Sequence, residues 1–148
     1  MIYQAAVLDY RARLGWPTHA VGTTVWLTPG AHVEAFNVPR DLGERTLTRL
    51  RAINSTPPVI NIPGPPDRWA LLVQPHDGAM SDILAQFADQ DVGYAYLGHH
   101  QGRSSEWGID LPPTRHPGRE PLTWITPPDT PLPPTAVVVR ALADVLTR

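Results

Sequence analysis

The sequence predicts a single α+β domain in which a mixed or antiparallel central sheet is flanked by helices. A chain of 148 residues has the length of one ordinary domain. Its helix-like and strand-like segments follow one another in the order αββαββαβββα. Strict alternation of strands and helices, which is typical of a parallel sheet, is absent from this order. The order therefore favours α+β over a doubly wound fold.

The first expected element is an amphipathic helix over residues 2–14. Gly15 and Pro17 provide its stop signal. Two short strands are expected next, at residues 24–27 and 33–38, because β-prone residues there are divided by a Pro-Gly pair. The apolar residues that share the inner face of the helix are Ile2, Tyr3, Ala6, Val7, Tyr10 and Leu14.

A second helix is expected after Pro39. Leu47, Leu50 and Ile53 share one face of it, and Asp41 lies four residues before Arg45, so that the two can pair on the solvent side. Two further strands are expected beyond it, at residues 59–62 and 69–73.

In the second half of the chain, two more helices and three strands are expected. Asp77 can cap a third helix that runs to about residue 88. A final helix is expected from Thr135, and the proline-rich segments 63–66 and 127–134 are expected to be ordered connections. The three strands are expected at residues 92–97, 107–111 and 122–125.

Composition excludes several kinds of chemistry. The chain has no cysteine, which excludes thiol catalysis and iron–sulfur clusters. All 12 basic residues are arginine, so a P-loop lysine and a Schiff-base lysine are excluded as well. The net charge of −2 gives no general attraction to nucleic acid or anionic lipid. No segment has the pattern of a signal peptide or a membrane span, and we therefore expect a cytoplasmic protein with no membrane partner.

Three motifs occur in an order that points to a known family. The run A-A-V-L-D-Y-R-A-R-L-G-W-P covers residues 5–17, V-W-L-T-P-G covers 25–30, and W-G-I-D-L-P-P-T at 107–114 is followed by L-T-W at 122–124. Together they resemble the N-terminal domain of the bifunctional DNA primase/polymerases (PrimPol). The resemblance is greatest to the shortened, divergent members found in actinobacteria, and it implies a reduced PrimPol core.

The resemblance also implies that the catalytic positions have changed. Active members hold divalent metals with an Asp-x-Asp pair, and Asn37 and Pro39 occupy the matching positions here. Arg68 matches the family's phosphate-contacting arginine, but Trp69 replaces the histidine that follows it. Ala95 occupies the position of a third carboxylate. Neutral or absent ligands cannot offset the dehydration of Mg²⁺.

We therefore expect a catalytically degenerate primase/polymerase-like domain that acts as a binding or regulatory module. Its expected partners are single-stranded nucleic acid, a nucleotide or a replication-related protein. No cofactor is expected, and Mg²⁺ or Mn²⁺ would be needed only if the family's activity survives. Arg68, Arg103, Arg45 and Arg49 are the candidate contacts to phosphate or nucleic acid, although acidic neighbours of the last two also favour a solvated, ion-paired face.

Two alternatives stay open. The first is an active metal-dependent enzyme with relocated ligands, for which Asp89, Asp91, His99 and His100 are the candidates. The simpler interpretation is a solvated turn for the two aspartates and a surface loop over residues 98–107 for the histidines. The second alternative is a protein-interaction scaffold that uses the 127–134 segment and the final helix.

The tryptophans admit two interpretations. Tryptophan beside arginine can stack on nucleic-acid bases. However, four of the five tryptophans lie within or beside apolar strand segments, where the side chain usually belongs to the core.

Overall fold

The computed structural model describes residues 2–30, 32–76, 85–87, 89–96, 99–101 and 108–147. Most of the expected third helix, residues 77–84 and 88, lies outside them. The elements, in chain order, are α1 (Ile2–Leu14), β1 (Thr18–Val21), β2 (Thr24–Leu27), β3 (Glu34–Pro39), α2 (Arg40–Ala52), β4 (Val59–Ile62), β5 (Arg68–Val73), β6 (Gly93–Tyr96), β7 (His99–Gln101), β8 (Ile109–Leu111), β9 (Thr123–Thr126) and α4 (Thr135–Leu146).

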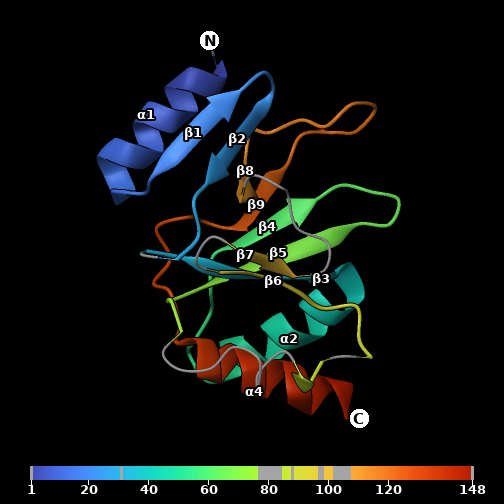
Figure 1. Ribbon diagram of the computed structural model, residues 1–148. Helices are drawn as coiled ribbons and strands as arrows, with labels where there is room; N and C mark the ends of the chain where they lie inside the picture. Colours follow the sequence, from blue (N-terminus) through green and yellow to red (C-terminus); the bar gives the residue numbers. More distant parts are fainter. Residues whose placement is uncertain are drawn as a thin grey trace.

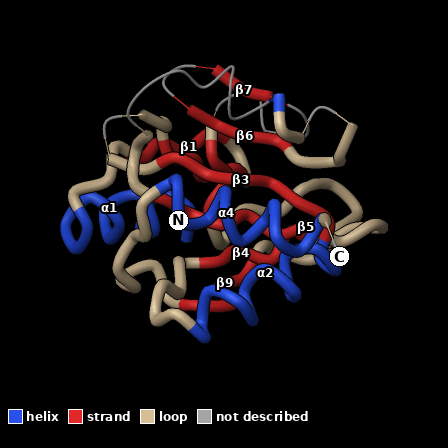
Figure 2. The backbone as a smooth tube through the Cα atoms, turned by 90° about the horizontal axis from the view of Figure 1, so that it is seen from below, coloured by secondary structure: helices blue, strands red, loops and turns tan. Residues whose placement is uncertain are grey.

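The strands form two sheets, and the helices lie outside them. The large sheet has the strand order β7-β6-β3-β5-β4-β9, and the small sheet has the order β1-β2-β8. All strand pairs in both sheets are antiparallel. Helices α2 and α4 cover one face of the large sheet, and the small sheet with α1 lies on the other side (Figures 1 and 2). The α+β prediction is confirmed, with the sheets antiparallel.

The large sheet is buried on both faces because its central strands alternate between two apolar clusters. Phe36 and Leu71 belong to the cluster beneath α2 and α4. Ala35 and Leu72 belong to the cluster shared with α1 and the small sheet. Every residue of β5 is buried, as expected for a strand covered on both sides.

Helix α1 packs on the small sheet through part of its predicted apolar face. Val7 and Tyr10 are buried, but Ile2 is 62% exposed, contrary to the prediction, because it lies in the first turn beyond the edge of the packing surface. The helix ends as expected: Gly15 has a φ of 68° and its N–H donates to the carbonyl of Arg11 at 3.0 Å.

Helix α2 buries Leu47 and Leu50 as predicted, and Arg45 lies 3.5 Å from Asp41 on its solvent side. Ile53, predicted on the same inner face, is 59% exposed. The helix ends at Ala52, so Ile53 follows the last helical turn and leaves the helical face.

Two strands were not predicted from the sequence. Strand β1, with the sequence T-H-A-V, pairs along its whole length with β2. Strand β7 falls within the segment expected to be a surface loop, and it pairs with β6 at the edge of the large sheet. Edge strands need only backbone pairing on one side, so a polar sequence can form one. That part of the loop prediction is wrong, and residues 102–107 lie outside the described chain.

The proline-rich segment before α4 is tied to the large sheet. The N–H of Gln74 donates to the carbonyl of Pro133, and its side-chain Nε2 donates to the carbonyl of Leu132, both at 2.9 Å. The expectation of an ordered connection here is confirmed. Within the described residues, no helix is long and apolar enough to cross a membrane.

Candidate functional site

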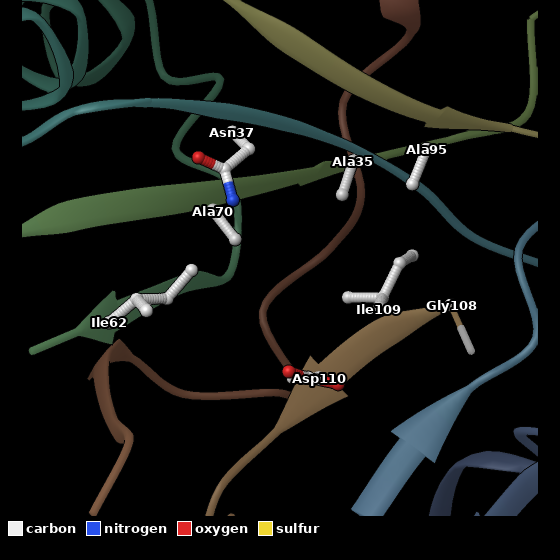
Figure 3. A pocket seen from close by; sticks show the side chains of 8 residues that line it. All are labelled: Ala35, Asn37, Ile62, Ala70, Ala95, Gly108, Ile109 and Asp110. Carbon is white, nitrogen blue, oxygen red and sulfur yellow. The ribbon is translucent and has the colours of Figure 1, made fainter. Parts of the chain in front are cut away.

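Two of the positions singled out by the resemblance line a small cavity between the two sheets. Asn37 on β3 and Ala95 on β6 both line it, and β8 contributes Asp110 from the opposite wall. The cavity has a volume of about 40 Å³. Figure 3 shows the side chains of the large sheet pointing towards β8 across this space. The complete lining is Ala35, Asn37, Ile62, Ala70, Ala95, Gly108, Ile109 and Asp110.

Arg68 lies beside this cavity and is held by internal partners. Its Nε donates to Oδ1 of Asn37, and its Nη1 lies 2.7 Å from Oδ2 of Asp91. Its Nη2 donates to the backbone carbonyls of Asn37 and Asp91 at 3.1 and 3.2 Å. Only 7% of the Arg68 side chain is exposed. The predicted phosphate contact is therefore not supported by the placement of this arginine.

Trp69 and Pro39 do not join Asn37 at the cavity. Trp69 is the neighbour of Arg68 along β5, so its side chain points to the other face of the sheet, where it is buried under α2. Pro39 pairs with Arg68 at the end of β3 and immediately precedes α2. Of the four positions singled out by the resemblance, the structure brings Asn37 and Ala95 together.

The carboxylate in the cavity wall was missed from the sequence. Asp110 is 12% exposed, and its Oδ2 lies 3.0 Å from Nε2 of His116. A charged residue between Ile109 and Leu111, both of which are buried, was the available signal, because a buried short strand rarely carries an acid without a partner.

These residues do not fit the two divalent cations that the resemblance implies. Asn37 offers a neutral amide oxygen that already accepts a bond from the Arg68 cation. Ala95 and Pro39 offer no side-chain ligand, and the Asp110 carboxylate is paired with His116. A guanidinium at this position repels a divalent cation, and one carboxylate is too few to hold two.

The other described arginines that were predicted to contact phosphate or nucleic acid lie away from this cavity, on α2. On α2, Arg45 pairs with Asp41, and the Nη2 of Arg49 lies 2.9 Å from Oδ2 of Asp144 on α4. Arg103 lies outside the described residues.

The candidate metal ligands fall in different parts of the fold. Asp89 is exposed and lies, like Asp91, before β6 and in no strand, while His99 and His100 are in β7. In the described part of the chain, no three His, Asp or Glu side chains gather to hold a metal ion.

A second polar cluster lies on the helix-covered face of the large sheet. Glu34 is 1% exposed, and its Oε1 accepts bonds from the backbone N–H of His76 at 2.7 Å and from the Tyr94 hydroxyl at 2.8 Å. The same oxygen lies 2.9 Å from Nδ1 of His76. Thr135 extends the cluster by donating to the carbonyl of Gln74 at 2.7 Å.

This cluster was also missed from the sequence, where Glu34 was only one residue of an expected strand. An acid in the otherwise apolar run V-E-A-F was the available signal. Burial raises the pKa of the Tyr94 hydroxyl, which therefore stays protonated and donates to Glu34.

The tryptophans belong mainly to the packing of the fold. Trp16 and Trp69 are buried. Trp16 stacks on Tyr10 with ring centroids 5.8 Å apart, and Trp124 donates its Nε1–H to the Tyr10 hydroxyl at 3.0 Å. Trp26 is partly buried and lies against His19, and Trp107 is outside the described residues. The core interpretation holds for Trp16 and Trp69.

No model of a known protein family, no curated protein and no solved structure matches the chain. The resemblance to PrimPol therefore stays a prediction from sequence motifs.

Proposed function

We propose that the chain is a catalytically degenerate primase/polymerase-like domain that acts as a binding or regulatory module, with single-stranded nucleic acid as its partner. The proposal rests on the sequence resemblance and on the side chains that surround Asn37. It assigns no nucleotidyl-transfer step to the domain.

The observation that carries the proposal is the internal pairing of Arg68 with Asn37 and Asp91. Where the resemblance expects carboxylates and metal, this chain has an amide and a cation that satisfy each other. The adjoining cavity of about 40 Å³ is also small, since ligand sites usually enclose roughly 300 Å³ or more. Both facts argue against a nucleotide and two metal ions at this position.

The binding role is assigned to the arginines on the exposed side of α2. Arg40, Arg45 and Arg49 all form ion pairs that leave a third or more of each arginine side chain exposed. Exposed ion pairs contribute little to stability, about 0–1 kcal/mol each. A phosphate backbone can therefore replace the carboxylate partners at small cost and release counterions as it binds.

Primer extension tests the catalytic half of the proposal. The full chain is incubated with a labelled primer on a template, deoxynucleotides or ribonucleotides, and Mg²⁺ or Mn²⁺. We expect no extension from the native chain or from Asn37→Asp, because Arg68 would neutralise the new carboxylate. Template-dependent extension that Asn37→Ala abolishes and Asp129→Asn leaves intact would overturn the proposal.

Fluorescence anisotropy with a labelled single-stranded oligonucleotide tests the binding half. We expect binding that weakens steeply between 50 and 200 mM salt, with slopes that fall in Arg45→Gln and Arg49→Gln, as for the loss of phosphate contacts. Arg13→Gln on α1 is the matched control, because Arg13 is also exposed and paired with an acid four residues away. Indifference to the oligonucleotide, with a stable oligomer on gel filtration, would favour the interaction scaffold instead.

A further inference from the structure

A cavity lies beside the Glu34–His76 cluster, on the far side of the large sheet from Asn37. It has a volume of about 660 Å³, which is within the range of small-molecule sites. Its walls come from the chain after β5 and from α4. The described residues that line it are Gln74, Pro75, His76, Gln86, Pro134, Thr135, Ala136, Val139, Arg140 and Ala143.

The ionisable side chains in the described lining are all basic. His76 and Arg140 are its ionisable side chains, and the described lining contains no acid. Arg49, the other arginine near α4, is paired with Asp144, whereas no ion pair is found for Arg140 among the described residues. A cation in a cavity whose described lining holds no acid attracts anions.

Glu34 fixes the histidine in this wall. Its Oε1 accepts from both the N–H and the ring Nδ1–H of His76, so the ring is held in one orientation, with Nδ1 as the protonated nitrogen. Glu34 is itself buried and also accepts from Tyr94, so its negative charge is largely satisfied within the cluster. His76 therefore lines the cavity as a ring held in one orientation, whose Nε2 can donate to an anion only in the doubly protonated form.

Apart from Arg140, the part of the wall that α4 contributes beyond Thr135 is apolar. Ala136, Val139 and Ala143 are on the face of α4 that borders the cavity. The lining thus combines a cationic end with an apolar surface.

We propose that this cavity binds a small anionic molecule with an apolar body, whose carboxylate or phosphate head group is held by Arg140 and His76. The proposal is independent of the primase-like function, because it uses neither Asn37 and Arg68 nor the arginines of α2. The two can therefore fail separately.

Isothermal titration calorimetry with hexanoate and with hexyl phosphate tests the site, since the two probes share a body and differ in head group. We expect saturable 1:1 binding of at least one of them, and the probe that binds identifies the head group. Hexylammonium, which has the same body and the opposite charge, should not bind. Failure of both anions to bind, or equal binding of hexylammonium, would overturn the proposal.

Substitutions then locate the site. Arg140→Gln should weaken binding about tenfold or more, as expected for the loss of a charge-assisted hydrogen bond. Arg140 is exposed, so this variant should fold normally. Arg13→Gln, at an exposed arginine on α1 that does not line the cavity, should bind like the native chain. Binding that survives Arg140→Gln unchanged would contradict the assignment.

His76 is tested by His76→Asn, which keeps a side-chain donor for Glu34 and removes the second ring nitrogen. We expect weaker binding with an unchanged far-ultraviolet circular dichroism spectrum. If this variant does not fold, the Arg140→Gln comparison still decides the outcome.

Discussion

The indole ring of Trp69 lies directly against Gly43 of α2. A Cβ atom at position 43 would come within 2.8 Å of the ring's Cε3 atom and 3.0 Å of the Trp69 Cβ. Helix α2 therefore approaches β5 closely at this point, and the ring fills the space between them. A side chain on residue 43 has no room unless the helix or the ring moves.

Gly43→Ala should therefore destabilise the protein. Alanine gains roughly 1 kcal/mol over glycine in a helix. Overpacking a filled core typically costs about 1–3 kcal/mol, and we expect this cost to prevail. Urea unfolding followed by circular dichroism measures the difference. In a Trp69→Leu background the same substitution should be neutral or stabilising, and stabilisation in the presence of Trp69 would contradict the packing argument.

Replacement of Arg68 should cost more than replacement of any surface arginine. Its guanidinium is 7% exposed and is bonded to Asn37 and Asp91, whose own side chain is 52% exposed. Loss of one partner of a buried pair costs about 3–5 kcal/mol, and the exposure of Asp91 reduces this to roughly 2 kcal/mol for Arg68→Leu.

Arg68→Lys is the sharper comparison. A lysine ammonium cannot reproduce the geometry of a guanidinium that bonds through all three nitrogens. We expect chemical denaturation to show a loss similar to that of Arg68→Leu, whereas Arg45→Leu should change stability by less than about 0.5 kcal/mol. A lysine variant as stable as the native chain would refute this assignment.

Titration of the protein to alkaline pH should reveal two tyrosines whose pKa values are raised. Burial raises the pKa of Tyr10 to about 12 from its usual 10.0, and burial also raises the pKa of Tyr94. The chain has 4 tyrosines and no lysine, so lysine does not obscure this range. Absorbance at 295 nm should show tyrosines that ionise well above pH 10, and they should ionise normally in urea.

The direction in which stability changes with pH follows from these raised pKa values. A raised pKa means that the folded state binds the phenolic proton more tightly than the unfolded chain does. This stabilisation is present below pH 10 and is lost as the pH rises through about 12. Two pKa units for Tyr10 correspond to about 2.7 kcal/mol. Tyr10→Phe should flatten the decline of stability between these pH values, and an unchanged slope would contradict the interpretation.

The ion pair between Arg49 and Asp144 should contribute little, although it joins α2 to α4. Its atoms are 2.9 Å apart, but 37% and 42% of the two side chains are exposed. A double-mutant cycle with Arg49→Ala and Asp144→Ala should give a coupling of about 0.2–1 kcal/mol that falls in 0.5 M salt. A coupling above about 2 kcal/mol would show that the pair acts as a buried one.

The sequence predicts most of the elements because each one follows from local periodicity. The bounds of α1, β2 and β4 agree with the prediction, and the other described strands that were expected shift by one or two residues. Strand β1 was missed because its short T-H-A-V sequence has a weak apolar pattern and depends on pairing with β2. Tertiary pairing, not local preference, makes this segment a strand.

The candidate sites were harder to predict because they depend on contacts distant in sequence. Glu34 meets His76 42 residues away, and Arg68 meets Asn37 31 residues away. Asn37 and Ala95, which the resemblance singled out, line one cavity. A motif match identifies a position but not the side of the sheet to which it points, and the structure buries Trp69 on the other face.

The pairing of β2 with β8 sets the order in which the chain can complete its fold. Val25 and Thr114 are 89 residues apart, yet the N–H of Val25 donates to the Thr114 hydroxyl. A growing chain therefore makes α1, β1 and β2 early, while the third strand of their sheet is still unsynthesised. Until β8 arrives, the edge of β2 is open, and the apolar side of this N-terminal unit has no cover. Folding of the first thirty residues is thus tied to a strand far along the chain, and a fragment that stops before Ile109 should aggregate instead of forming an independent unit.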